Sequence, residues 1–132
     1  MHAKSNQMSR FAAILLALLV VMHSIVALDL FLNFFPETEE FRAMWSIALW
    51  AKVLWAVLCI IGAAGVFLLY RRPWLGFFTS AVFCACLYIA SIQLWGEVKG
   101  GFWLAVVAAI LAAFGAERSN NSFKSTPRRG AA

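Results

Sequence analysis

Three ionisable side chains, His23, Asp29 and Lys52, lie inside long apolar stretches of the sequence. An ionisable side chain is costly in a membrane interior, so each of them is a candidate for a functional site if a partner can be named. A tight turn near residue 40 would bring together helix positions whose numbers add up to about 81, which places Asp29 beside Lys52 at one depth. One interpretation is an ion pair between them. In the other, Lys52 extends its ammonium group to the membrane surface and Asp29 lies among hydrated headgroups.

The same register places His23 level with Leu58 and Cys59, near the middle of the membrane. We interpret His23 as a neutral, hydrogen-bonded residue between helices, with a proton-relay or metal role as the alternative. Trp55 lies about 15 Å below the membrane boundary, so its indole N–H is predicted to face the bundle and donate to a neighbour. A cation–π contact would join it to Lys52. The candidate intramembrane polar site therefore consists of Asp29, Lys52, His23 and Trp55.

The sequence contains no Ser-His-Asp, HExxH, P-loop or GxGxxG pattern. The other histidine, His2, is at the extreme N-terminus, which disfavours haem held by two histidines of one chain. Cys84 and Cys86 are two positions apart, so on a helix their thiols diverge by about 200°, unlike those of a redox CxxC motif. Together with Cys59 they are interpreted as small packing residues. We predict no catalytic residue, no bound cofactor, no metal site and no enzymatic activity.

Composition sets the class of protein. Of the 132 residues 64% are hydrophobic, whereas soluble domains have about 45–50%. Most of the charged residues, 11 Lys and Arg and 6 Asp and Glu in total, cluster between the apolar stretches and near the C-terminus. No segment outside the apolar stretches is long enough to bury a core, which excludes a separate soluble catalytic domain. The basic pI of 9.6 does not indicate nucleic acid as a partner, because the basic residues flank apolar spans.

Four apolar spans separated by short loops predict an all-α fold, a polytopic membrane protein built as an antiparallel four-transmembrane-helix bundle. Pro36 is expected to end the first helix, Thr38 to cap the second, and Pro73 to lie in the first turn of the third. A cytoplasmic N-terminus (1–10) precedes a single membrane domain (11–117), and a disordered cytoplasmic tail (118–132) follows it. The predicted helices cover about 11–35, 42–70, 74–95 and 98–117.

The distribution of Lys and Arg predicts the orientation in the membrane. Arg42, Lys52 and Lys99 fall on one side, and the other eight fall on the opposite side. The positive-inside rule therefore places both termini in the cytoplasm. The first apolar run is too long for the core of a cleaved signal peptide, so we expect it to remain as the first helix. The eight residues are Lys4, Arg10, Arg71, Arg72, Arg118, Lys124, Arg128 and Arg129.

The C-terminal residues Asn120–Ala132, NNSFKSTPRRGAA, carry a resemblance. They are similar to tails of the type NSFKPTPLRGAA that recur on unrelated bacterial proteins, and depart from them at Ser125 and Arg128. The resemblance implies translated repetitive sequence without a selected role, and a bacterial source, hence an inner membrane. The four-helix part resembles DoxX-like and other small four-span bacterial proteins in size and number of spans, although the first helix lacks the glycine expected of DoxX.

These observations favour a small, non-enzymatic integral protein of the bacterial inner membrane with a structural or partner-binding role in the bilayer. Its partner would be a second copy of the chain or another membrane protein. The alternative is an oligomeric permease for a small solute or protons that uses Asp29, Lys52 and His23.

Overall fold

The computed structural model describes residues 7–125, and within this range the chain is all-helical. Four long apolar helices account for most of it: α1 (Gln7–Leu32), α3 (Leu49–Arg71), α4 (Pro73–Trp95) and α5 (Gly100–Ser125). A short helix, α2 (Glu39–Trp45), lies between α1 and α3. Each long helix has an apolar stretch long enough to cross a membrane. The predicted all-α fold of a multi-pass membrane protein is confirmed.

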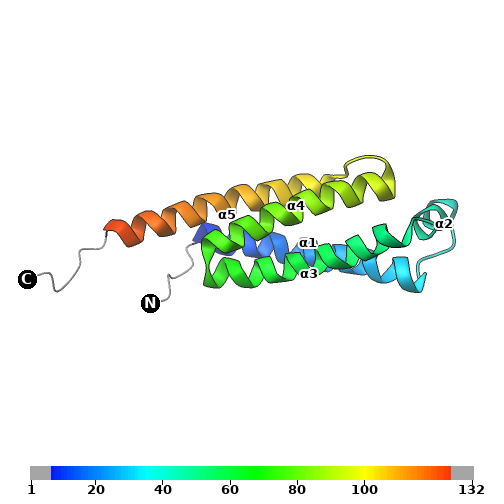
Figure 1. Ribbon diagram of the computed structural model, residues 1–132, viewed down its shortest axis with the longest axis horizontal. Helices are drawn as coiled ribbons and strands as arrows, with labels where there is room; N and C mark the ends of the chain where they lie inside the picture. Colours follow the sequence, from blue (N-terminus) through cyan, green and yellow to red (C-terminus); the bar gives the residue numbers. More distant parts are fainter. Residues whose placement is uncertain (1–6, 126–132) are drawn as a thin grey trace, which may run out of the picture.

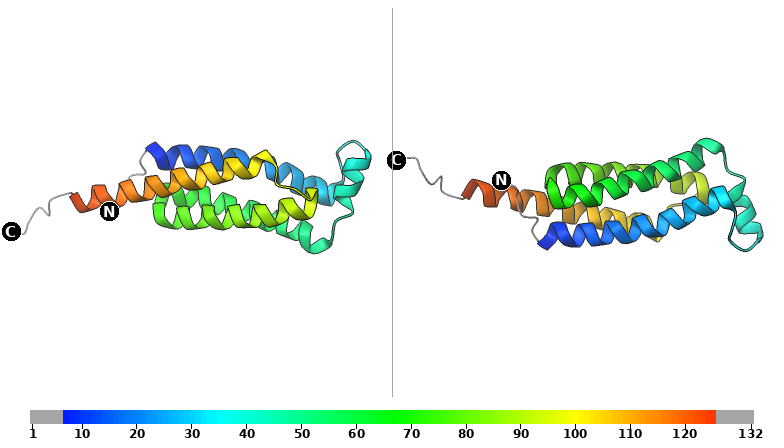
Figure 2. Two further views of the ribbon diagram at one scale, coloured as in Figure 1. Left: turned by 90° about the horizontal axis from the view of Figure 1, so that it is seen from above. Right: turned by 90° about the horizontal axis from the view of Figure 1, so that it is seen from below.

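The four long helices form a ring in which each contacts its two neighbours. Helix α1 packs against α3 and α5, and α4 packs against the same two helices. Neighbouring helices run in opposite directions, and α2 crosses one end of the bundle beside α1 (Figure 1, Figure 2). The axis of the ring is therefore the place where side chains from all four helices meet.

The turn between α3 and α4 is a single residue, Arg72. Its backbone is extended, with φ −139° and ψ 90°, and Pro73 follows it at the start of α4. Proline disfavours the helical conformation of the preceding residue but fits the first turn of a helix. Pro73 therefore both ends α3 and begins α4, as the sequence predicts.

The second predicted helix is interrupted. The sequence predicts one helix over about 42–70, but the structure has two helices, α2 and α3, with residues 46–48 between them. Thr38 caps α2 as expected, since its Oγ1 accepts a hydrogen bond from the backbone N–H of Phe41 at 3.3 Å. Ala48 is extended, with φ −58° and ψ 147°, which separates α3 from α2. The continuous helix predicted here is wrong.

Two other helix ends differ from expectation. Gly96, with φ +72°, ends α4 in the left-handed conformation that glycine adopts most easily. Helix α5 begins at Gly100 and continues to Ser125, so the prediction of disorder is wrong for residues 118–125. No proline interrupts the helix before Pro127, and the last part of α5 extends past the α3–α4 turn (Figure 1). Residues 126–132 of the predicted tail lie outside the described residues.

Glycines allow the helices to approach closely. A Cβ atom at Gly62 would lie 2.5 Å from Cγ2 of Val20, and one at Gly65 would lie 3.0 Å from Cδ2 of Leu16. The antiparallel register of α1 and α3 at these contacts therefore agrees with the one predicted from the turn. At Gly76 a Cβ atom would lie 2.7 Å from the backbone nitrogen of Leu69, so here the backbones of α3 and α4 nearly touch.

We predict that Gly76→Ala destabilises the protein. The added methyl group would meet backbone atoms of Leu69, which cannot rotate away, and such overpacking costs about 1–3 kcal/mol. Gly100→Ala is the matched control, because a Cβ atom there has no neighbour within 4 Å. The free energy of unfolding in detergent micelles should fall for Gly76→Ala alone. Equal stability of the two variants would contradict the close backbone contact.

Candidate functional site

The carboxylate of Asp29 is completely buried near the end of α1, with 0% of the residue exposed. Its Oδ1 accepts a hydrogen bond from the backbone N–H of Phe35 at 2.9 Å. Its Oδ2 accepts one from the indole N–H of Trp45 at 2.8 Å. Both oxygens of the buried carboxylate therefore have a donor, which offsets the cost of removing the group from water.

The chain brings these two donors to Asp29 by reversing direction directly after α1. Asn33 adopts the left-handed conformation, with φ 53°, and its N–H donates to the backbone carbonyl of Asp29 at 2.7 Å. The reversal brings the N–H of Phe35 back to the carboxylate. The ring of Phe35 packs on Phe41, 5.1 Å between centroids, and Phe41 stacks on Trp45 at 6.4 Å. These ring contacts hold Phe35, Phe41 and Trp45 together beside Asp29.

The Asp29–Lys52 ion pair expected from the sequence does not form. The salt bridges of the described residues are Glu37–Arg42 and Glu97–Lys99. Lys52 is half-buried in the first turn of α3. The alternative in which Asp29 lies among hydrated headgroups is also wrong, since the residue is buried. The register predicted the depth of the two residues, but the side chain of Asp29 is engaged by the reversed segment and by α2.

His23 lies where all four long helices meet. Its ring stacks on Trp55 of α3, with 5.4 Å between centroids and 15° between planes, and the edge of Phe83 of α4 lies 6.3 Å away. Gly101 of α5 faces the same ring, since a Cβ atom there would lie 3.4 Å from Cε1 of His23. Nδ1 donates to the backbone carbonyl of Leu19 at 2.6 Å. This is the interhelical, hydrogen-bonded position we expected. The register of α1 and α3 places residue 23 opposite Leu58 and Cys59, as predicted, while the His23 ring reaches Trp55 one turn away on α3.

Trp55 is completely buried and also contacts Trp95, 5.5 Å between ring centroids with the planes at 79°. It faces the bundle as predicted. The predicted hydrogen bond is wrong, because its Nε1 has no partner in the described part of the chain. Nor does Lys52 contact its ring: the cation–π contacts found over residues 7–125 are Arg71 with Phe67 and Lys99 with Trp95. Trp55 therefore acts through ring packing.

The candidate site is thus two separate clusters. One joins Asp29 to Trp45, and the other joins His23 to Trp55, while Lys52 belongs to neither. Among the described residues no group of three or more His, Cys, Asp or Glu side chains could hold a metal ion. Cys59, Cys84 and Cys86 are half-buried and unpaired.

Trp45 is a residue of the site that we did not predict from the sequence. A usable signal exists. A buried carboxylate needs donors, and Trp45 is an N–H donor on the next element of the chain.

A charged pair closes the α4–α5 turn at the same end of the bundle. The ammonium group of Lys99 donates to Oε1 of Glu97 at 2.8 Å and lies 6.0 Å above the ring of Trp95. This hydrogen bond, reinforced by charge attraction, lowers the pKa of Glu97 and raises the pKa of Lys99. Both groups are exposed, so the pair orients the turn and adds little stability.

The surface around these clusters is that of a membrane protein. Large apolar side chains are exposed along every long helix, among them Leu18, Ile60, Phe78 and Val107. Fold and surface together define a small multi-pass membrane protein with a buried, hydrogen-bonded carboxylate. No family model, curated protein or solved structure was found to match this chain.

We predict that Asp29 and Trp45 are energetically coupled and that Asp29 and Lys52 are not. Trp45→Phe keeps an aromatic ring beside Phe41 but leaves Oδ2 of Asp29 without its donor, which should cost about 1.5–3 kcal/mol. In double-mutant cycles of unfolding free energy in micelles, Asp29→Asn and Trp45→Phe should be non-additive. Asp29→Asn and Lys52→Gln should be additive. No coupling in the first cycle would show that the hydrogen bond does not hold α2. Coupling in the second cycle would show that Asp29 and Lys52 interact after all.

Proposed function

We propose that this chain is a small, non-enzymatic protein of the bacterial inner membrane, with both termini in the cytoplasm and a structural or partner-binding role in the bilayer. The observation that carries the proposal is the position of Asp29. A transport or proton-relay residue has to release and rebind its ligand, and so needs an open position. Asp29 has none, because each of its oxygens binds a donor of its own fold and the residue is completely buried.

The position of His23 in the centre of the bundle also supports a structural role. His23 is enclosed by helices α3, α4 and α5 and held by the carbonyl of Leu19. A residue packed in this way fixes the arrangement of the helices. The permease alternative needs His23, Asp29 and Lys52 to act together, and the contacts of the described residues join none of the three to another.

A partner has a suitable surface between α4 and α5. There, an apolar groove of about 450 Å³ faces outward from the bundle. Small side chains such as Ala81, Ala109 and Ala113 line it, which allows the backbone of a neighbouring transmembrane helix to come close. That helix would belong to a second copy of the chain or to another membrane protein. The remaining lining residues are Phe77, Cys84, Val106, Ile110 and Phe114.

The orientation is supported by the two ends of the bundle. Arg10, Arg71, Arg72 and Arg118 lie near the end with the α3–α4 turn, whereas Glu37, Glu39, Glu40 and Glu97 lie near the other end. Basic residues remain on the cytoplasmic side during insertion. The end with the α3–α4 turn is therefore the cytoplasmic one.

We predict that liposomes containing the purified protein conduct neither protons nor small solutes above the level of protein-free liposomes. Asp29→Asn should lower stability without changing this flux, since the carboxylate is structural. A pH-sensitive dye and a solute-swelling assay measure the two fluxes. A flux present in the natural protein and lost in a stably folded Asp29→Asn or Lys52→Gln variant would overturn the proposal in favour of a permease.

Reporter fusions test the orientation. Fusions after Arg72 and Arg118 should show cytoplasmic activity, and fusions at Glu40 and Lys99 should show periplasmic activity. A pair of reporters with opposite requirements, alkaline phosphatase and green fluorescent protein, gives each position its own control. Periplasmic activity after Arg118 would reverse the proposed orientation.

A further inference from the structure

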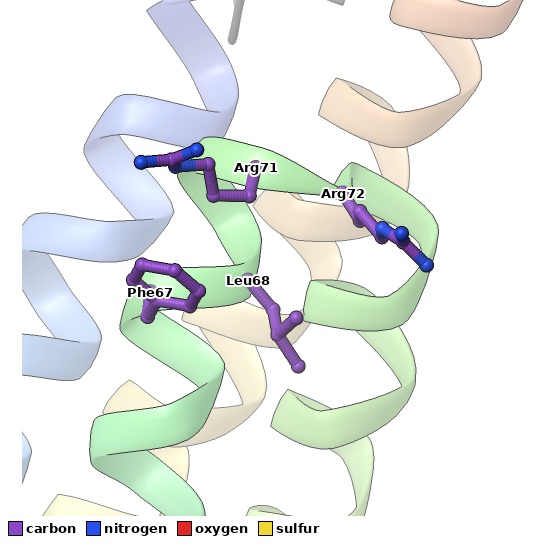
Figure 3. A pocket seen from close by; sticks show the side chains of 4 residues that line it. All are labelled: Phe67, Leu68, Arg71 and Arg72. Carbon is purple, nitrogen blue, oxygen red and sulfur yellow. The ribbon is translucent and has the colours of Figure 1, made fainter. Parts of the chain in front are cut away.

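A pocket lies at the α3–α4 turn, apart from the two buried clusters. It has a volume of about 250 Å³ and is lined by Phe67, Leu68, Arg71 and Arg72. The two arginine side chains point away from the turn in different directions. Leu68, which precedes them on α3, lies between them (Figure 3). The pocket thus combines cationic groups at the end of the bundle with apolar side chains on the membrane-spanning part of α3.

Neither guanidinium group is neutralised by a carboxylate. The salt bridges of residues 7–125 involve Glu37 and Glu97, both near the opposite end of the bundle. Glu117 of α5 is exposed and forms no ion pair with either arginine. Arg71 has a contact that positions it, since its guanidinium carbon lies 5.4 Å above the ring centroid of Phe67. Both arginines are therefore available to an external anion.

The apolar half of the pocket indicates what kind of anion this is. The side chain of Phe67 is 59% exposed and begins one helical turn before Arg71, about 6 Å deeper along the helix axis. A soluble anion gains nothing from such a surface. A phospholipid presents a phosphate at the level of the arginines and an acyl chain at the level of Phe67 and Leu68, and arginine suits phosphate because its N–H groups bind two oxygens at once.

We propose that Arg71 and Arg72 bind the headgroup phosphate of an anionic phospholipid, with one acyl chain along Phe67 and Leu68. The proposal rests on the membrane location argued above, and basic pockets at helix ends are where anionic headgroups bind membrane proteins. Phosphatidylglycerol fits, since it carries a net negative charge. Phosphatidylcholine has the same phosphate, but its choline cation is repelled by the second arginine.

Native mass spectrometry of the full-length protein in a mild detergent tests this inference. Titrated phosphatidylglycerol should bind more tightly than phosphatidylcholine. Arg71→Gln and Arg72→Gln should each weaken phosphatidylglycerol binding about five-fold, since one basic residue near the surface contributes about that factor. Arg118→Gln is the matched control: it removes the same charge from an exposed position outside the pocket and should leave the affinity unchanged.

Three results would overturn the proposal. One is unchanged binding in both single variants, each confirmed as folded by its thermal midpoint. Another is an equal loss in Arg118→Gln, which would show that net charge alone attracts the lipid. The third is competition by soluble glycerol phosphate as effective as that by the intact lipid, which would assign the pocket to a soluble phosphate compound. Carbonate extraction of membranes keeps the outcomes separate, because a protein released by carbonate contradicts the membrane role itself.

Discussion

A buried carboxylate that must find donors organises one end of this molecule. Asp29 lies in an apolar helix, where an unsatisfied carboxylate would be far more costly than in water. The chain meets this requirement locally: it reverses at Asn33 to supply the N–H of Phe35, and it folds α2 across the bundle end to supply the indole of Trp45. The break between α2 and α3 follows from the same demand, because a continuous helix would carry Trp45 along α3 and away from α1.

Packing without polar groups dominates further along the bundle. Water does not drive helices together inside a bilayer, so close contact between backbones and side chains has to do so. Gly62, Gly65 and Gly76 provide that contact between α3 and its two neighbours. His23 adds a ring that touches α3, α4 and α5 while its one hydrogen bond stays within α1. The middle of the bundle is therefore held mainly by shape, and the end with α2 by hydrogen bonds.

The sequence predicted those features that depend on composition and on single residues. The four apolar spans, the cap at Thr38 and the helix start at Pro73 follow from hydropathy and backbone chemistry, and the register of α1 and α3 follows from the length of their connection. The hydrogen-bond partner of Asp29 cannot be predicted in this way, because the register gives the depth of a side chain and not the direction in which it points. The continuation of α5 past Arg118 does not follow from composition, because a polar segment does not exclude a helix and a helix already begun needs little to continue.

The charged groups at the two ends of the bundle differ in their partners, and this difference connects structure with function. At the end with α2, Asp29 accepts a hydrogen bond from Trp45, and Glu37 and Glu97 form salt bridges with Arg42 and Lys99. At the other end, Arg71 and Arg72 have no carboxylate partner among the described residues. The buried carboxylate of the described residues is satisfied by neutral N–H donors, so Arg71 and Arg72 are left to the surroundings. An anionic lipid headgroup can supply the negative charge that the chain does not place beside Arg71 and Arg72. We therefore expect the membrane to neutralise this end of the bundle.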